Sequence, residues 1–333
     1  MTSNRVLIMM ATYNGASYIQ KQLDSILHQT ITDWHLIIRD DNSNDDTVAI
    51  LKNYAAKDSR ISVIENHSQY HGAYHNFFAL VRHVKETGNA YPFYMFVDQD
   101  DIWDTDKIAK YQTFYKEKAQ NESTPLLIYG DMRLIDGQDQ ETAPSIDALI
   151  GTHYTNAIST FFSHRVFGCN TYFNQALFAA LPDIPEGADV LAYLSHDNFL
   201  TKTAALFGEV HYYPDTVMGY RRDGQNVTSK HQYNYKFSRI LKRLSAFDDL
   251  AKDHALTYKQ SLAAIALFRE KALEKKQAQF LDEIETIINR GGLFSLKEVN
   301  RLQIDFGKKI KNISHQLVLV NGCYKKYLKS GDE

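Results

Sequence analysis

The sequence predicts an α/β fold, in which helices flank a mostly parallel sheet, followed by a C-terminal α-helical region. Two observations favour it. Short apolar runs alternate with helical patterns as far as residue 135, and beyond Lys230 proline is absent and helical periodicity dominates. The 333 residues suffice for about two domains, and 44% hydrophobic and 23% charged residues exclude disordered, collagen-like and disulfide-rich classes.

Five apolar runs in the N-terminal part are typical of buried strands. Between the first runs, apolar residues recur at helical spacing in Ile19–Leu27, Asp45–Ala56 and Asn76–Val84. Such alternation implies right-handed crossovers and a parallel sheet, whose ligands bind at the carboxyl ends of the strands. The five runs are Val6–Met10, Trp34–Arg39, Ile61–Ile64, Phe93–Val97 and Leu126–Tyr129.

The chain from residue 136 to residue 228 is predicted to be less regular. Gly137, Pro144 and Gly151 punctuate residues 136–170, which we expect to be mostly turns. The regular elements expected after them are helices over Asn174–Leu181 and Asp197–Phe207 and a strand pair, Val210–Tyr213 and Val217–Tyr220, around Pro214-Asp215.

Charge divides the chain at about the same place as periodicity. From Lys230 to the end there are 20 Lys and Arg against 12 Asp and Glu, whereas the remainder carries 17 against 28. An acidic body with a basic tail suggests two surfaces with different partners, although a solvated helical face would look the same. We therefore expect one domain over residues 1–228, with halves 1–110 and 111–228, and a helical region over residues 229–333.

One basic stretch of the tail has the pattern of an amphipathic helix lying on an anionic membrane. A helical bundle or a dimer interface packed on the first domain is the alternative. The stretch interleaves Phe237, Ile240, Leu241 and Leu244 with Lys236, Arg239, Lys242 and Arg243.

Cysteine usage and hydropathy indicate a cytoplasmic protein. Cys169 and Cys323 lie far apart, and the chain has no C-x-x-C and no H-E-x-x-H motif, so zinc-ribbon and zincin sites are not expected. The N-terminus lacks the features of a signal peptide. The longest apolar run, Leu262–Phe268, is far shorter than the roughly 18 residues of a membrane-spanning helix.

Polar clusters follow three of the predicted strands, in the segments 11–15, 40–47 and 98–103. Helix capping accounts for Asn44 to Asp46 in the second segment but not for Asp40 and Asp41 at the strand end. A carboxylate there can accept a hydrogen bond from the imide N–H of uracil or thymine. This segment therefore predicts a nucleoside site.

The third cluster, with Asp98, Asp100 and Asp101, predicts a divalent cation. Three neighbouring carboxylates repel each other unless a cation lies among them, and alternation places Asp98 and Asp100 on one face. Hard oxygen ligands favour Mg²⁺ or Mn²⁺, which often also bind substrate phosphates. An acidic surface turn is the alternative. Because G-x-G-x-x-G and G-x-x-x-x-G-K-[ST] loops are missing, side chains and the metal would hold a nucleotide diphosphate.

Taken together, these motifs resemble the family 2 glycosyltransferases with the GT-A, Rossmann-like fold, over about residues 4–228. The sequence motifs of the family are matched at residues 12–15, 25–30, 40–45 and 98–101. More specific motifs at residues 36–41, 98–103, 196–198 and 220–222 resemble those of bacterial rhamnosyltransferases of cell-wall and capsular polysaccharides. The resemblance implies a nucleotide-binding half followed by an acceptor half.

The resemblance also implies roles for individual residues. Thr12, Tyr13 and Asp41 would contact the donor nucleoside, while Asp98 and Asp100 would form the D-x-D pair that binds the metal and diphosphate. Asp197 falls where the family carries its catalytic base. An inverting transfer needs such a base to deprotonate the acceptor hydroxyl. Asp197 could also simply cap the helix that begins there, and both roles can hold.

Further residues are expected at the edges of this site. Arg221 and Arg222 follow a strand and could neutralise the diphosphate. Many relatives carry a histidine, sometimes a metal ligand, near the place of Asp223. This sequence departs from that pattern: either Asp223 binds the metal instead or the metal dependence is weak, and Asp223 is left unassigned. The remaining expected contacts are Trp103 and His196 to the acceptor, with Trp103 equally suited to the core, and Asn76 to the donor or to a helix start.

The predicted function is an inverting, metal-dependent glycosyltransferase that moves L-rhamnose from dTDP-β-L-rhamnose onto a lipid-linked polysaccharide acceptor at the inner face of the membrane. A family 2 enzyme with a UDP-hexose donor is the first alternative. A sugar nucleotidyltransferase would need a glycine-rich phosphate loop after the first strand, which is absent. A non-catalytic sugar-nucleotide-binding protein would not need Asp197. A homodimer remains an open expectation.

Overall fold

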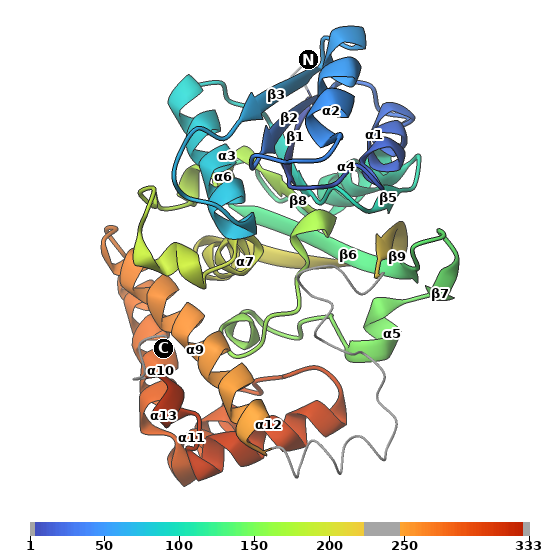
Figure 1. Ribbon diagram of the computed structural model, residues 1–333. Helices are drawn as coiled ribbons and strands as arrows, with labels where there is room; N and C mark the ends of the chain where they lie inside the picture. The colour runs from blue at the N-terminus through green and yellow to red at the C-terminus, as the bar shows by residue number, and fades with distance from the viewer. Residues whose placement is uncertain (1–3, 223–246, 329–333) are drawn as a thin grey trace.

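The computed structural model describes residues 4–222 and 247–328, which form an α/β unit followed by helices (Figure 1). Nine strands form one sheet in the order β3-β2-β1-β4-β8-β6-β9-β5, with β7 paired to β6. The predicted α/β class with a C-terminal helical region is confirmed. The predicted boundary near residue 228, Asp223 and the basic stretch around Phe237 to Leu244 lie outside the described residues.

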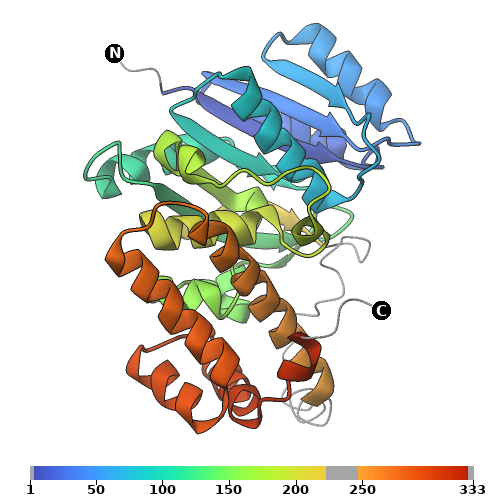
Figure 2. The same ribbon diagram turned by 90° about the vertical axis from the view of Figure 1, so that its left-hand side faces the viewer.

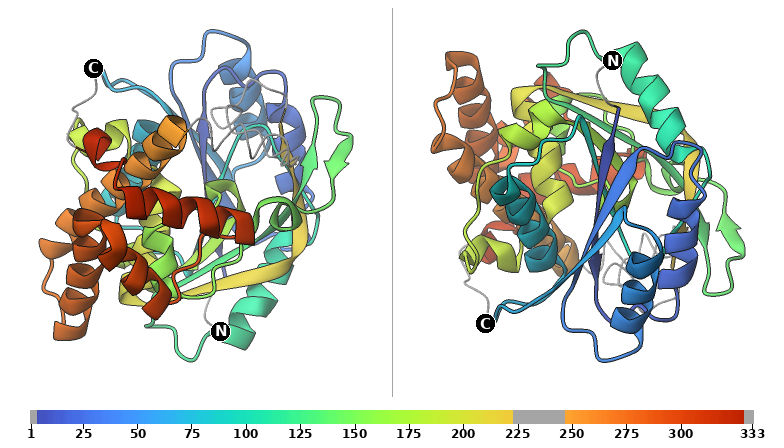
Figure 3. Two further views of the ribbon diagram at one scale, coloured as in Figure 1. Left: turned by 90° about the horizontal axis from the view of Figure 1, so that it is seen from below. Right: turned by 90° about the horizontal axis from the view of Figure 1, so that it is seen from above.

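The N-terminal part of the sheet is parallel, as predicted, because each strand returns through a helix. Alternate residues of the first strand enter two different cores: Leu7 and Met9 pack on one side, and Ile8 and Met10 on the other. Figure 3 shows helices on both sides of this part of the sheet. The elements are β1 (Val6–Thr12), α1 (Ile19–Leu27), β2 (Trp34–Asp40), α2 (Thr47–Lys57), β3 (Ile61–Glu65), α3 (Ala73–Thr87) and β4 (Phe93–Val97).

The second part of the sheet is mixed. Its strand β8 runs antiparallel to both β4 and β6, and β6 runs parallel to β9. Its elements are β5 (Ile102–Trp103), α4 (Lys107–Lys118), β6 (Leu126–Ile135), β7 (Glu141–Ala143), α5 (Ile146–Ile150), the 3-10 turns η1 (Ala157–Phe161) and η2 (Gly168–Asn170), β8 (Thr171–Asn174), α6 (Gln175–Ala180), η3 (Asp189–Ala192), α7 (His196–Phe207) and β9 (Glu209–Arg221).

Strand β9 differs from the strand pair expected around Pro214-Asp215. It is one strand of 13 residues, and its pairing with β6 shifts in register between Tyr213 and Thr216. Pro214 and Asp215 therefore bulge from the ladder instead of forming a turn, which is the place in a sheet where a proline costs least. The continuous strand carries Arg221 to the edge where β4 ends.

The C-terminal helices pack against α7 and η1 on one side of the α/β unit (Figures 1 and 2). Phe199 of α7 stacks on Phe268 of α9, with ring centroids 5.5 Å apart, and the buried Arg165 forms an ion pair of 3.0 Å with Asp305. These helices are α9 (Phe247–Arg269), α10 (Lys275–Arg290), α11 (Gly292–Arg301), α12 (Lys309–Asn321) and α13 (Lys325–Leu328). Among residues 4–222 and 247–328, no helix combines the length and apolar character needed to cross a bilayer.

Candidate active site

The acidic cluster lies where β4 ends. Ligand atoms of Asp98, Asp101 and Cys169 are all within 4.8 Å of one another. Burial, and then the neighbouring charge of Asp100, raises the pKa of Asp98 to about 7, and the same two causes raise the pKa of Asp101 well above its usual range. These carboxylates are therefore crowded and poorly solvated, which is the condition that a bound cation would relieve.

The chemistry of the donor set fits a hard divalent cation. One oxygen of Asp101, Oδ1, accepts a hydrogen bond from the backbone N–H of Arg221 at 3.0 Å, whereas the buried Oδ2 has no hydrogen-bond partner among the described residues. Burial raises the pKa of the Cys169 thiol well above its usual range, so this sulfur stays protonated. The groups available to bind a metal ion are thus carboxylate oxygens, which are suitable ligands for Mg²⁺ or Mn²⁺.

A buried lysine that the sequence analysis did not single out lies beneath this cluster. Lys107 Nζ donates to the carbonyl of Cys169 at 3.0 Å and lies 4.2 Å from the ring centroid of Trp103. Burial lowers the pKa of Lys107 to about 7. Its amine therefore offers the carboxylates only partial compensation at neutral pH.

Arg221 holds the acidic segment in place from β9. Its guanidinium is fully buried and donates to the carbonyls of Asp100 at 2.7 Å and Asp136 at 2.5 Å, and it pairs with Asp139 at 2.6 Å. With these partners, we expect Arg221 to position the acidic cluster and to act on a diphosphate only at a distance. The neighbouring Arg222, half-buried, follows at the end of the strand.

The end of β1 presents an exposed aromatic ring on a fixed backbone. The Tyr13 N–H donates to Gln99 Oε1 at 2.8 Å, and Gln99 Nε2 donates back to the Tyr13 carbonyl at 2.9 Å. The side chain of Tyr13 is left 54% exposed, whereas Thr12 is buried and its hydroxyl donates to Asp40 at 2.8 Å. Of the two, Tyr13 is therefore the one whose side chain can stack on a ring.

Asp41, the residue after β2, is buried and contacts three neighbouring groups. Asn66 Nδ2 donates to its Oδ1 at 2.6 Å, His71 Nδ1 lies 3.0 Å from the same oxygen, and the Gly72 N–H donates to Oδ2 at 2.7 Å. Asn76 is buried behind it and bridges β1 and β2 through the carbonyls of Thr12 and Arg39. The helix begins three residues earlier than predicted, at Ala73, so Asn76 lies in its first turn, where its side chain fixes the two strand ends.

Asp197 lies in the first turn of α7 and faces η2. Its Oδ2 accepts the Gly168 N–H at 3.1 Å and lies 3.3 Å from His164 Nε2. Burial raises the pKa of Asp197, but the charge and hydrogen bond of His164, together with the charge of His196 and a hydrogen bond with Ser195, bring the pKa well below its usual range. The carboxylate is therefore kept ionised.

Residues of η2 connect the carboxylate of Asp197 to the acidic cluster. Gly168 contacts Asp197, while the next residue, Cys169, belongs to the group with Asp98 and Asp101. The charge of Asp197 also contributes to the raised pKa of Asp98. A side chain at position 168 would collide with α7, since a Cβ there would lie 2.3 Å from His196 Nε2. Glycine therefore allows η2 to pack closely against α7 between the two acidic groups.

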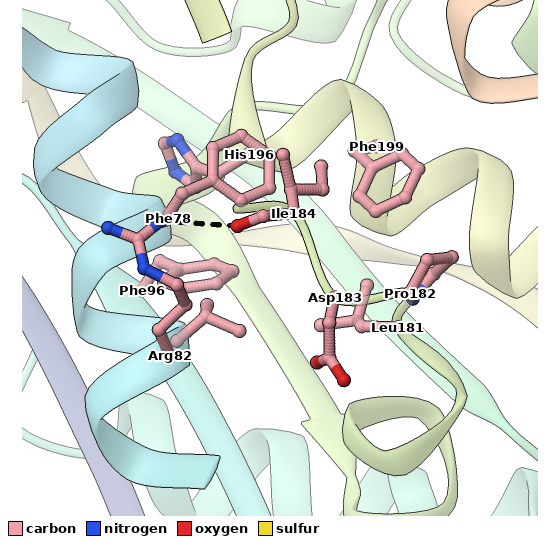
Figure 4. A pocket seen from close by; sticks show the side chains of 10 residues that line it. Phe78, Arg82, Phe96, Leu181, Pro182, Asp183, Ile184, His196 and Phe199 are labelled. Carbon is pink, nitrogen blue, oxygen red and sulfur yellow. Dashed lines mark hydrogen bonds between the residues drawn. The ribbon is translucent and has the colours of Figure 1, made fainter. Parts of the chain in front are cut away.

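Trp103 and His196, which were predicted to contact the acceptor, both have buried side chains, and for Trp103 this agrees with its alternative role in the core. Trp103 is 2% exposed and lies under Lys107. His196 is 8% exposed and stacks on Phe77 with ring centroids 3.7 Å apart. Figure 4 shows a small, largely apolar pocket beside His196, lined also by Phe96 and Phe199. The imidazole thus faces core side chains.

The chain is similar to several known glycosyltransferases. The chain matches the family described as "Glycosyl transferase family 2" over residues 7–226. It is 39% identical over 100 residues to the dTDP-rhamnosyl transferase RfbG of Shigella flexneri, covering 30% of this chain and 34% of that protein. It is 32% identical over 103 residues to the UDP-Glc:alpha-D-GlcNAc-diphosphoundecaprenol beta-1,3-glucosyltransferase WfgD of Escherichia coli, covering 31% and 38%. These matches span little more than a third of each relative.

Solved structures share the fold over almost the whole chain. S. aureus TarS 1-349 in complex with UDP-GlcNAc superposes with a TM-score of 0.55 at 15% identity, covering 97% of this chain and 91% of that one. The mannosyltransferase PcManGT of Pyrobaculum calidifontis, in complex with GDP-Man and Mn2+, gives 0.51 at 16% identity, covering 98% and 88%. With the family match extending across β1 to β9, the chain belongs to the family 2 glycosyltransferases.

Proposed function

We propose that the protein is an inverting glycosyltransferase that moves L-rhamnose from dTDP-β-L-rhamnose to a lipid-linked polysaccharide acceptor, forming an α-L-rhamnosyl linkage. The observation that carries the proposal is the junction at η2, where Gly168 contacts a candidate base and Cys169 contacts a candidate cation site. RfbG supports the rhamnose donor, and WfgD, which is described as using UDP-Glc, supports a UDP-hexose as the second candidate.

The donor nucleoside would lie between the ends of β1 and β2. The ring of Tyr13 is exposed for stacking. The carboxylate of Asp41, oriented by Asn66, His71 and Gly72, would accept the imide N–H of a thymine or uracil. Thr12 and Asn76 would act by fixing the two strand ends through their hydrogen bonds. Residues 1–110 would thus serve as the nucleotide-binding half and residues 111–228 as the acceptor half.

Asp98 and Asp100 would hold Mn²⁺ or Mg²⁺, with Asp101 beside them. When bound, the metal supplies positive charge that neutralises the diphosphate as it leaves. Arg222 would add a guanidinium on the β9 side, and Arg221 would keep the acidic segment in position. The Mn2+ complex of PcManGT supports this assignment.

Asp197 would act as the base. In an inverting transfer the acceptor oxygen attacks the anomeric carbon on the face opposite the diphosphate, and its proton must pass to a nearby group. The Asp197 carboxylate is ionised and lies close enough to the acidic cluster for its charge to act on Asp98, which supports this role. Asp197→Asn should therefore abolish transfer, by about 10²-fold or more, while nucleotide binding survives. A variant that keeps most of its activity would remove Asp197 from this role.

A donor comparison tests the substrate. Purified protein with Mn²⁺ or Mg²⁺ is given dTDP-rhamnose, UDP-glucose or UDP-GlcNAc together with a rhamnosylated lipid-linked acceptor, and product is measured by mass spectrometry. The proposal expects transfer from dTDP-rhamnose. Transfer from a UDP-hexose alone would contradict the rhamnose donor and leave the family intact.

We further propose that the enzyme works at the inner face of the plasma membrane, held there by its basic C-terminal part, with a second copy of the chain as a further candidate partner. The excess of Lys and Arg beyond Lys230 supports an anionic surface as the partner. Flotation with vesicles containing anionic lipid should recover the protein, and recovery should fall as salt rises. Equal recovery with neutral vesicles would contradict this location.

A further inference from the structure

His164 is in direct contact with the proposed base, Asp197, although the sequence analysis did not predict it as a site residue. It lies in the segment between η1 and η2, and its Nε2 is 3.3 Å from Asp197 Oδ2. The side chain of His164 is 29% exposed and that of Asp197 is 15% exposed. The imidazole is thus partly open to solvent while it contacts the carboxylate.

The contact determines which group retains a proton. The pKa of Asp197, although raised by burial, is lowered further by His164 and lies well below its usual range. The part of this shift that comes from the charge of His164 exists only while the imidazole is protonated, so the transfer rests on the contact itself. A carboxyl is ordinarily a stronger acid than an imidazolium, and a protonated Asp197 Oδ2 can pass its proton to a neutral His164 Nε2 that lies 3.3 Å away. Histidine is the side chain that ordinarily changes charge between pH 5 and 8, so it can receive and later release this proton.

We propose that His164 receives, through Asp197, the proton that leaves the acceptor hydroxyl; this inference rests on the proposed function. The acceptor oxygen forms its bond to the anomeric carbon, and the bond from that carbon to the diphosphate oxygen breaks with its electron pair staying on the diphosphate. The hydroxyl proton moves to Asp197 Oδ2 and then to His164 Nε2. A carboxylate and an imidazolium remain, and the imidazolium releases its proton to water after the product leaves.

Other titratable groups around Asp197 are less suited to this task. Burial lowers the pKa of His196 to about 4, and burial lowers the pKa of Lys202, whose ammonium donates to Asn198 Oδ1, to about 7. The charge of Asp197 also contributes to the raised pKa values of three other groups. These are Tyr74 on α3, Tyr154 in the segment after α5, and Asp98 at the end of β4. His164 combines contact with the carboxylate and access to solvent. Because it acts through Asp197, it is a positioning and proton-holding residue.

His164→Gln tests the proposal, because glutamine can still hydrogen-bond to Asp197 but cannot hold a proton. The matched control is His153→Gln, which changes an exposed imidazole that stacks on Tyr212. Transfer is measured from pH 5.5 to 8.5 at saturating donor and acceptor, together with KM for the donor and the thermal melting of each variant. Asp197→Asn is measured in parallel.

The proposal expects His164→Gln to lower kcat about 10- to 100-fold at pH 7.5 with the donor KM unchanged, while His153→Gln keeps the wild-type profile. In the wild type, kcat should fall on acidification as the imidazole takes a proton in advance, and this fall should be lost in His164→Gln. A wild-type kcat that stays constant from pH 8 to 5.5 would overturn the proposal without any variant. Wild-type rates in His164→Gln beside an inactive Asp197→Asn would overturn the role of His164 alone, whereas an active Asp197→Asn would overturn the base.

Discussion

Two acidic clusters at the same edge of the sheet look alike in sequence and differ in structure. After β2, Asp40 accepts hydrogen bonds from the backbone N–H and hydroxyl of Ser43 and from Thr12, and Asp45 accepts from Ala16 and Thr47. After β4, burial and like charges raise the pKa values of Asp98 and Asp101. The first cluster is neutralised by donors of its own loop and of the segment that follows β1, and the second is not.

The difference shows how to separate structural acids from functional ones. Carboxylates that accept several N–H and O–H bonds stabilise the loop that supplies the donors. Carboxylates that face each other with a buried, unbonded oxygen destabilise the metal-free protein and are retained where a cation binds. The two clusters should therefore respond in opposite ways to the same substitution.

The largest effect is expected for Asp98→Asn. This change removes a proposed metal ligand, so transfer should fall by about 10³-fold and added Mn²⁺ should no longer raise the melting temperature. Stability of the metal-free variant should equal or exceed that of the wild type, because one of the crowded charges is gone. Initial rates and melting curves with and without Mn²⁺ measure both quantities.

Asp40→Asn is the matched control in the other cluster. An amide nitrogen would face the donors of Ser43 and Thr12, so the free energy of unfolding should fall by about 1–3 kcal/mol while the Mn²⁺-induced shift persists. If Asp98→Asn destabilised the protein as much as Asp40→Asn does, the distinction between the clusters would fail.

A smaller effect is expected from pH. The pKa of Asp98 is about 7 in the folded, metal-free protein and about 4 in the unfolded chain, so between these values the folded state binds more protons and stability falls as pH rises. Buried His196 and His254, whose pKa values burial lowers to about 4 and 3, act in the opposite sense. The difference between wild type and Asp98→Asn cancels the histidines and reports Asp98 together with its effect on the neighbouring Asp101.

That difference should grow by about 2 kcal/mol in favour of the variant between pH 5 and 7.5, less than the full shift because the carboxylate is partly exposed. Urea unfolding at a series of pH values, in the presence of a chelator, measures it. A difference that does not change with pH would contradict the crowding of charges.

The smallest effect is expected for Tyr13→Ala, next to the first cluster. The side chain is exposed, so stability should change by less than about 0.5 kcal/mol. Loss of stacking on the nucleobase should weaken dTDP binding about 5- to 10-fold, and Tyr13→Phe should restore it. Titration calorimetry at fixed Mn²⁺ measures both, and unchanged binding by Tyr13→Ala would exclude the ring from the donor site.

Much of the fold could be predicted because its first strands are long apolar runs separated by amphipathic helices. Strand β8 has only four residues, Thr171–Asn174, and gives no such signal. The division of β9 was wrong because Pro214 is compatible with either a turn or a bulge, and only pairing with β6 decides between them. Elements defined by their partners in the sheet are those that periodicity misses.

For the site, the expectation that ligands bind at the carboxyl ends of the strands identified the acidic residues, but it did not identify the side chains that contact them. Gln99 and Tyr13 are 86 residues apart, and Lys107 and Cys169 are 62 apart, so neither contact has a local pattern. Trp103 and His196 stand beside polar residues in the sequence, and only the tertiary packing shows that they are buried. The contact between His164 and Asp197 likewise depends on how η2 approaches α7.

The metal dependence of nucleotide binding tests the central claim most directly. The dissociation constant of dTDP is measured by calorimetry for the wild type and Asp98→Asn, with Mn²⁺ and with a chelator. A cation bridging the acidic cluster and the diphosphate predicts at least tenfold tighter binding with Mn²⁺ in the wild type and no gain in Asp98→Asn. Equal affinity with and without Mn²⁺ in the wild type, or an undiminished gain in the variant, would contradict the account.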